Sequence, residues 1–174
     1  MFEAARVKVR KMTVDDTDLY HSWRNDPEVM QLTNPALDTY HLEETRTFVE
    51  HVILGSQSAK SYIIVDKETE TAIGVTSLIN LDYKNRNAEC IIDIGNKNYW
   101  GNGYGKEAMQ LLLDYAFLEL NLHRVFLRVF SFNGRAIKLY EKLGFQHEAG
   151  RANACSETES GMILSIWACY KRNM

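Results

Sequence analysis

Three glycines at alternate positions, between a predicted strand and a predicted helix, constrain this chain most. Gly101, Gly103 and Gly105 lie in the run YWGNGYGKEA at 99–108. The residues before them, 88–94, are mostly apolar, as in a strand, and the residues after them, 103–118, repeat apolar side chains at helical spacing. The run therefore predicts a strand–loop–helix unit, which occurs in folds that combine a sheet with helices.

The same glycines predict either an anion site or only a tight turn. Backbone N–H groups of such a loop can point at an anion, a diphosphate above all, where the helix dipole also favours negative charge. A turn that needs positive φ explains the glycines as well, so both interpretations stay open. Two common phosphate loops are excluded, because Glu107 follows Gly105-Lys106 and because the glycines are spaced two apart.

The rest of the chain predicts further strands and helices. A helix starting near Thr13 should fail before Pro27, where Asp26 can cap a short second helix. A longer helix is predicted over 39–54, capped by Asp38 or Thr39, ended by Gly55, and buried along Leu42, Val49, Val52 and Ile53. Further strands are predicted at 6–10, 61–65, 72–81, 123–130, 145–148 and 162–170, and a further helix at 133–143. Strands and helices in this order predict a sheet with helices on two faces.

Composition and charge narrow the function classes. Charged residues make up 25% and hydrophobic residues 45% of the chain, which excludes a disordered protein. A formal net charge of −3 gives no basic face for nucleic acid. The sequence has neither a run apolar enough to span a membrane nor a secretory signal, so we expect no membrane contact and a cytoplasmic location. The histidines and cysteines form no short ligand pair, so we expect no metal site.

Two motifs in the second half resemble those of a known family. Residues 100–105, WGNGYG, are similar to the acyl-CoA loop Gln/Arg-x-x-Gly-x-Gly/Ala of the GCN5-related N-acetyltransferases (GNAT). Residues 133–145, NGRAIKLYEKLGF, resemble that family's Asn-x-x-Ala-x-x-x-Tyr-x-x-x-Gly-Phe segment. The motifs occur in the family's order with a predicted strand between them, which is more specific than either alone. Residues 23–29, WRNDPEV, resemble the branch containing ribosomal-protein alanine and spermidine acetyltransferases.

The resemblance covers essentially the whole chain and implies its architecture. It implies one domain over 1–174, of α/β (α+β) class, with helices on both faces of a mixed, largely antiparallel sheet that is splayed at the acyl-CoA site. Acceptor-side helices would lie at about 13–55 and the acyl-CoA-binding core at about 88–145. Two positions depart from the pattern: Trp100 stands where many members have Gln or Arg, and 151–161 does not resemble the acceptor loop of polyamine enzymes.

The resemblance also implies an activity. It implies direct transfer of an acetyl group from acetyl-CoA to the primary amine of a small molecule, of polyamine, aminoglycoside or amino-sugar type. The alternatives are acetylation of a ribosomal or other protein N-terminus, and a non-catalytic acyl-CoA sensor. A homodimer is a possible assembly.

Cofactor contacts follow from the same resemblance. N–H groups of the glycine loop would hold the CoA diphosphate, and main-chain groups of the preceding strand would pair with pantetheine. The residues implied are Ile92, Asp93, Ile94, Trp100, Gly101, Asn102, Gly103, Tyr104, Gly105, Lys106, Asn133 and Lys138.

Tyr140 and Glu89 are the candidate catalytic residues. The resemblance implies that Tyr140 is a general acid for the leaving thiolate, whereas its spacing alone also fits a core aromatic. Glu89 shares a strand face with Ile91 and Asp93 and could accept the proton of an ammonium, or form an ion pair with Arg86 or another basic residue. Asp93 is the second choice for the base.

The first helices are rich in acids. Residues 13–50 carry nine of them against Arg24 and Arg46: Asp15, Asp16, Asp18, Asp26, Glu28, Asp38, Glu43, Glu44 and Glu50. An acidic wall would attract a cationic amine, and a solvated helix face explains the same composition.

Overall fold

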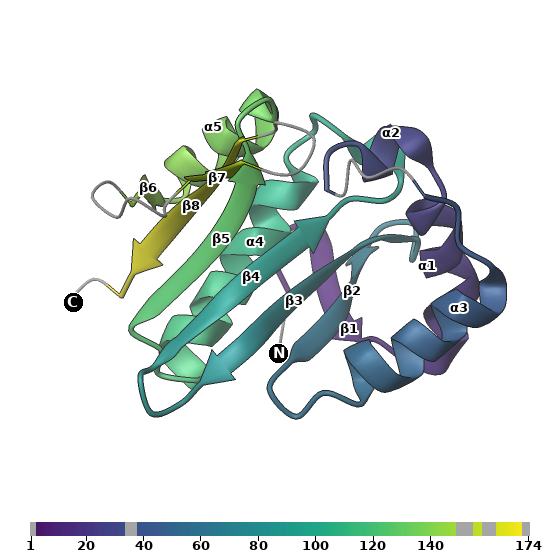
Figure 1. The fold of residues 1–174 in the computed structure, drawn as a ribbon, viewed down its shortest axis with the longest axis horizontal. Helices are drawn as coiled ribbons and strands as arrows, with labels where there is room; N and C mark the ends of the chain where they lie inside the picture. Colours follow the sequence, from purple (N-terminus) through teal and green to yellow (C-terminus); the bar gives the residue numbers. More distant parts are fainter. Residues whose placement is uncertain (1–2, 34–37, 149–154, 158–162, 172–174) are drawn as a thin grey trace.

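A computed structural model describes residues 3–33, 38–148, 155–157 and 163–171. Figure 1 shows a central sheet with helices packed against it. The strands are β1 (Val7–Lys11), β2 (Lys60–Asp66), β3 (Ala72–Asp82), β4 (Asn87–Asp93), β5 (Arg124–Phe130), β6 (Gln146–His147), β7 (Cys155–Glu157) and β8 (Ile163–Tyr170). The helices are α1 (Thr17–Arg24), α2 (Pro27–Met30), α3 (Leu42–Thr47), α4 (Tyr104–Asp114) and α5 (Gly134–Lys142). Short 3-10 segments are η1 (Val14–Asp16) and η3 (Lys97–Tyr99), and π-helical segments are η2 (Phe48–Leu54) and η4 (Tyr115–Glu119).

The strands that the structure describes form one mixed sheet in the order β1-β2-β3-β4-β5-β8-β6, with β7 also pairing with β8. All pairs are antiparallel except β4 with β5. That parallel pairing stops after Glu89 and Phe126, although β4 continues to Asp93 and β5 to Phe130. Among the described residues, the main-chain groups on this side of β4 after Glu89 therefore lack a strand partner, and the predicted splay of the sheet is confirmed.

Helices cover both faces of the sheet, as predicted (Figure 1). On one face, Met109 of α4 and Tyr140 of α5 pack with Leu78, Cys90 and Leu127 of the strands. On the other face, Val49 of η2 packs with Met12, Ile63 and Val75, and Tyr20 of α1 lies against this second cluster. Because side chains alternate along a strand, Cys90 and Ile92 belong to the first face, and Glu89, Ile91 and Asp93 to the second.

The start of α2 agrees with the capping signals predicted from the sequence, whereas the start of α3 does not. Asp26 caps α2, its carboxylate accepting from the N–H groups of Glu28 and Val29, with Pro27 at the first helical position. The predicted cap of the next helix at Asp38 or Thr39 is wrong. His41 is the capping residue, and its N–H donates to Glu44 Oε2 at 2.7 Å.

The buried stripe predicted along 39–54 is only partly right. Val49 is buried, but Leu42 and Val52 are exposed. Val52 is exposed because the helix changes from α3 to the π-helical η2 at Phe48, and a π-helix has more residues per turn and moves the following side chains around the axis. Leu42 lies before that change, as the first residue of α3. The same change at η4 leaves Leu118 exposed. No helix in the described part of the chain has the length and apolar content needed to cross a bilayer.

Candidate active site

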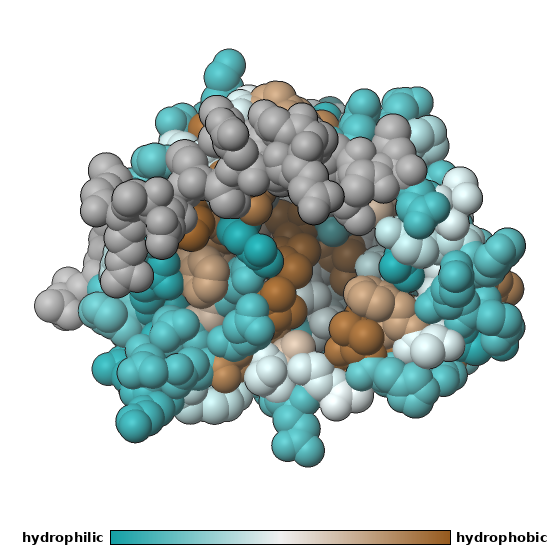
Figure 2. Space-filling model, in the orientation of Figure 1, coloured by the Kyte–Doolittle hydropathy of each residue, from teal (hydrophilic) through white to brown (hydrophobic). Residues whose placement is uncertain are grey.

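A cavity of about 940 Å³ opens where β4 and β5 separate. It is lined by α1 and α2, the ends of β4 and β5, the glycine loop and α5. Figure 2 shows the molecule hollowed on this face, with hydrophobic residues inside the hollow. This volume falls in the usual range for small-molecule sites. Side chains from both faces of the sheet reach it, because Tyr140 and Asp93 both line it.

The glycine loop has a conformation that needs two of its three glycines. Gly101 and Gly103 have φ of +78° and +88°, whereas Gly105 does not have positive φ. Gly103 is the capping residue of α4, so the N–H groups of Tyr104 and Gly105 are among those that a helix leaves without intrahelical partners. The tight-turn interpretation thus holds for two positions, and the helix start next to them keeps the geometry of an anion site.

The start of the chain holds this loop in place. Arg6, just before β1, donates from Nε to Glu107 Oε1 at 2.7 Å and from Nη1 to the Asn102 carbonyl at 3.0 Å. Its guanidinium also lies 4.5 Å from the centre of the Tyr104 ring. This contact is not predictable from the sequence, because the two segments are about a hundred residues apart in the chain.

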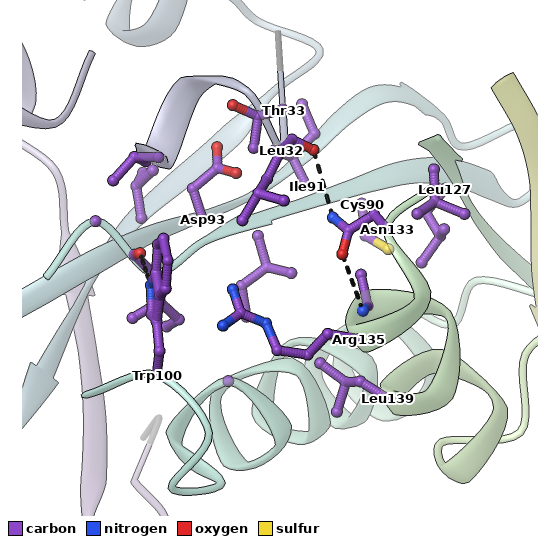
Figure 3. A pocket seen from close by; sticks show the side chains of 18 of the residues that line it. Leu32, Thr33, Cys90, Ile91, Asp93, Trp100, Leu127, Asn133, Arg135 and Leu139 are labelled. Atoms are coloured by element: carbon purple, nitrogen blue, oxygen red, sulfur yellow. Dashed lines mark hydrogen bonds between the residues drawn. The ribbon is translucent and has the colours of Figure 1, made fainter. Parts of the chain in front are cut away.

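Cations gather around the rim of the cavity. Lys106, Arg135, Lys138 and Lys142 all line it. The Arg135 guanidinium lies 4.4 Å from the centre of the Trp100 ring, and Trp100 Nε1 donates to the Ile94 carbonyl at 2.6 Å (Figure 3). Lys106, Lys138 and Trp100 are among the residues predicted from the sequence. Arg135 is not, although its charge within the second motif was an available signal.

Tyr140 lies at the inner wall of the cavity. Its side chain is 8% exposed and its ring packs 5.7 Å from Phe145, centre to centre. Burial raises the pKa of the Tyr140 hydroxyl, and the nearby Cys90 and Asp93 raise it further. The hydroxyl therefore stays protonated at neutral pH and can act only as a proton donor or hydrogen-bonding group.

Glu89 is buried in a network of its own. One carboxylate oxygen accepts from Arg128 Nε at 2.7 Å and the other from Asn80 Nδ2 at 3.2 Å. The ion-pair partner is thus Arg128 of the neighbouring strand, and Arg86 bonds instead to Asn121. The carboxylate borders the cavity, at the last paired position before β4 and β5 separate.

Asp93 lies at the end of β4, on the face of the first helices, beside Val75 of β3. Figure 3 shows its carboxylate pointing away from Arg135. In the described part of the chain this carboxylate has no ion-pair partner, and its apolar surroundings raise its pKa to about 6. Such a carboxylate is ionised at neutral pH but still basic enough to take up a proton.

Asn133 links the second motif to the first helices. Its Oδ1 accepts from the Ala136 N–H at 3.2 Å, so it caps α5, and its Nδ2 donates to the Leu32 carbonyl at 3.4 Å (Figure 3). Lys97 makes a second link, with its Nζ 2.8 Å from Asp26 and 3.2 Å from Glu28. The segment 26–33 is therefore attached to both sides of the cavity.

Comparison with known proteins agrees with this geometry. The family model described as an acetyltransferase (GNAT) domain matches residues 6–146. The uncharacterized N-acetyltransferase p20 of Bacillus licheniformis is 37% identical over 82% of this chain and 80% of the relative. A spermidine N(1)-acetyltransferase of Escherichia coli K12 is 31% identical over 85% of this chain and 77% of the relative.

A solved structure shares the fold over nearly its whole length. The spermidine N-acetyltransferase of Vibrio cholerae, in complex with CoA and spermine, superimposes with a TM-score of 0.81 over 96% of each chain. Its sequence identity of 23% makes this a likeness of fold.

Proposed function

Since the chain belongs to the GNAT acetyltransferases, we propose that Tyr140 and Asp93 supply the acid and the base of its reaction. The protein is an N-acetyltransferase that takes the acetyl group from acetyl-CoA and gives it to the amine of a small molecule. The observation that carries our assignment is that Tyr140 and Asp93, from opposite faces of the sheet, line one cavity at the splay.

The residues around the cavity suit acetyl-CoA. Unpaired main-chain groups after Glu89 can bond to an extended pantetheine arm, as a further strand would. The start of α4 and the four rim cations can hold phosphates. Bound there, the donor supplies an acetyl group on a thioester. We propose that these contacts are made by the residues predicted from the sequence, together with Arg135 and Lys142.

Asp93 and Tyr140 divide the proton transfers. An amine reaches the enzyme as an ammonium, and Asp93 takes its proton so that the nitrogen lone pair can attack the acetyl carbon. As the carbon–nitrogen bond forms and the carbon–sulfur bond breaks, Tyr140 donates its proton to the sulfur. The nitrogen then loses its second proton, which restores the Tyr140 hydroxyl directly or through water, and the amide and the free CoA thiol leave. Glu89, the base favoured by the sequence, is the alternative, but it is already bonded to Arg128 and Asn80.

The transfer is direct. Cys90 lines the cavity, but burial raises the pKa of its thiol, with a smaller effect from Glu89. A thiol held neutral is a poor nucleophile, so an acetylated cysteine is not expected on the reaction path.

Release of free thiol from acetyl-CoA in the presence of amines tests the proposal. Spermidine comes first because three relatives bear its name, followed by an aminoglycoside, an amino sugar and Ala- and Ser-initiated peptides. Turnover of a small amine supports the proposal, and turnover of peptides alone would favour the N-terminal alternative. Stoichiometric CoA binding without thiol release from any amine would contradict an enzyme and favour a sensor.

Self-association is a further part of the proposal. A spermidine N-acetyltransferase of Vibrio cholerae with this fold is dodecameric. This supports self-association of the present chain in general, and a homodimer is the assembly that we propose. Sedimentation velocity of the full chain at several concentrations measures it, and a monomer throughout would contradict it.

A further inference from the structure

An arginine with no acidic partner among the described residues lies where the first helices line the cavity, a region that we call the acceptor end. Arg24 is the last residue of α1 and lines the cavity. Its guanidinium lies between two rings, 3.6 Å from the centre of Tyr40 and 4.5 Å from the centre of Phe48. Its Nη1 is buried and has no hydrogen-bond partner among the residues that the structure describes. The two rings hold the planar guanidinium in position, and the N–H groups at its edge remain able to donate hydrogen bonds to a ligand.

The acids of the first helices are directed elsewhere. Asp16 pairs with Arg10, Asp26 and Glu28 with Lys97, and Glu43 with Arg46. Asp38 and Glu44 accept from backbone N–H groups at 39 and 41. The remaining three, Asp15, Asp18 and Glu50, line a separate surface depression together with Arg46. None of the nine lines the large cavity, so the acidic-wall interpretation of residues 13–50 fails there.

The acceptor end therefore has the wrong charge for a linear polycation. Its residues from the first helices are aromatic or apolar apart from Thr33 and Arg24. A second ammonium placed here would meet Arg24, and like charges in a partly buried site repel. A buried N–H donor that lacks a partner also costs free energy, and a guanidinium fork binds a carboxylate or a phosphate through paired hydrogen bonds.

We propose that the acceptor is an amine that also carries an acidic group, a carboxylate or a phosphate, which binds Arg24 while its amine lies at Asp93. This inference rests on the proposed function and narrows its substrate class.

Tyr20 shows that the two charges flank one space. Burial, followed by the charge of Asp93, raises the pKa of the Tyr20 hydroxyl to about 12, while the charge of Arg24 opposes the shift. The ring also stacks on Phe48, 6.5 Å away between centres. Tyr20 is thus within electrostatic reach of both groups, and all three residues line the same cavity.

Matched pairs of amines test the inference on the wild-type enzyme. Thiol release at saturating acetyl-CoA is compared for ω-amino acids from glycine to 5-aminopentanoate against the alkylamines that lack the carboxylate. O-phosphoethanolamine against ethanolamine forms the phosphate arm, and spermidine is the polycation. We expect kcat/KM to be roughly tenfold or more higher for at least one acid-bearing amine than for its neutral partner and for spermidine, the gain of one charge-assisted contact. The chain length that is preferred reports the distance between the two ends.

Arg24→Met then tests the residue. It should remove the preference, raising KM for the acid-bearing amine about tenfold relative to KM for its neutral partner, with KM for acetyl-CoA measured in parallel as the control. Arg24→Lys should restore part of the preference, because it keeps a point charge but loses the fork. An equal loss with all amines would show a structural role and overturn the assignment.

The outcomes separate this inference from the function on which it rests. Turnover of neutral amines or spermidine, with no preference for an acidic group, would overturn the inference and leave acetyl transfer standing. Thiol release from no amine, despite CoA binding, would overturn the proposed function and this inference together. If Arg24→Met does not fold, the wild-type comparison of matched pairs alone decides.

Discussion

At the scale of single residues, the hydroxyl of Tyr140 can be tested apart from its ring. Tyr140→Phe keeps the ring against Phe145 and removes only the proposed proton donor. We expect kcat to fall about 10²-fold or more, the usual contribution of a general acid, with the Kd for CoA changed less than about twofold. Stopped-flow or steady-state thiol release and calorimetric CoA titration measure the two quantities.

Thermal unfolding is the control for this variant. In the described part of the chain the Tyr140 hydroxyl has no hydrogen-bond partner, so its loss should leave Tm nearly unchanged. A variant with unchanged kcat would show that Tyr140 is a core aromatic, the alternative that its spacing left open.

The raised pKa of Asp93 predicts a pH dependence of activity. A base must be deprotonated to work, so kcat/KM of the wild type should fall as pH is lowered through about 6. Asp93→Asn should lose most activity, and Glu89→Gln should keep the same acid limb. The opposite result, an acid limb retained in Asp93→Asn and lost in Glu89→Gln, would assign the base to Glu89.

The same pKa predicts a change in stability with the opposite sign to that of a salt-bridged carboxylate. Between the ordinary value of 3.8 and about 6 the folded state binds more protons at Asp93 than the unfolded state. The free energy of unfolding therefore decreases as pH rises through that window. Relative to wild type, Asp93→Asn should gain on the order of 2 kcal/mol between pH 4 and pH 8, measured by urea unfolding. No relative gain would mean that the carboxylate is well solvated.

Residue roles were only partly predictable from the sequence. Strand alternation placed Glu89 and Asp93 on one face correctly, because it depends only on the period of a strand. The partners of Glu89, and the lack of an acidic partner for Arg24 among the described residues, were not predictable, because they depend on which strand and which loop come to lie beside them. The structure pairs Glu89 with Arg128, 39 residues later in the chain.

At the scale of elements, a substitution in the glycine loop can test the effect of backbone strain without adding a steric clash. Gly101 has φ of +78°, and a Cβ added there would meet no atom within 4 Å. Gly101→Ala should therefore act through strain alone, costing about 1 kcal/mol of unfolding free energy. Because a relaxed loop would move its N–H groups, the Kd for CoA should rise severalfold, as calorimetric titration can measure.

Gly134→Ala is the matched control for the loop variant. Gly134 begins α5, lacks positive φ and likewise has open space around an added Cβ. Alanine there should be neutral or slightly stabilising and should leave CoA affinity unchanged. Equal effects of both substitutions would contradict a special conformation at Gly101.

The positions of the helices were more predictable from the sequence than the choice of side chains that each helix buries. Capping and proline signals located α2 because they act within one turn. The stripe over 39–54 failed at Val52 because the sequence contains no visible signal for the π-helical turns of η2. The wider π-helical turns depend on how the helix packs against β2 and β3, where Val49 lies in one cluster with Ile63 and Val75.

At the scale of the whole molecule, the splay connects the two faces of the sheet. β4 and β5 stay paired only through Glu89 and Phe126, and beyond that point the cavity reaches both the α5 face and the face of the first helices. The sequence implied this opening only through resemblance to a family, because strand composition says nothing about where a pairing stops.

The segment at the start of β1 holds the glycine loop in place, and this gives a last prediction. Arg6 joins the start of β1 to Glu107, to the Asn102 carbonyl and to the Tyr104 ring, so it fixes the loop without lining the cavity. Arg6→Met should raise the Kd for CoA severalfold, whereas exposed ion pairs contribute only about 0–1 kcal/mol to stability, so Tm should change little. Calorimetric titration and thermal unfolding measure the two effects.

Lys8→Met is the control on the same strand. Lys8 also forms an ion pair, with Glu70, and this pair does not involve a residue of the glycine loop. It should leave CoA affinity unchanged. If both variants weaken CoA equally, the effect is general charge loss; if neither does, the loop keeps its shape without β1. Only a selective effect of Arg6→Met would establish that a residue outside the cavity positions the N–H groups of the loop.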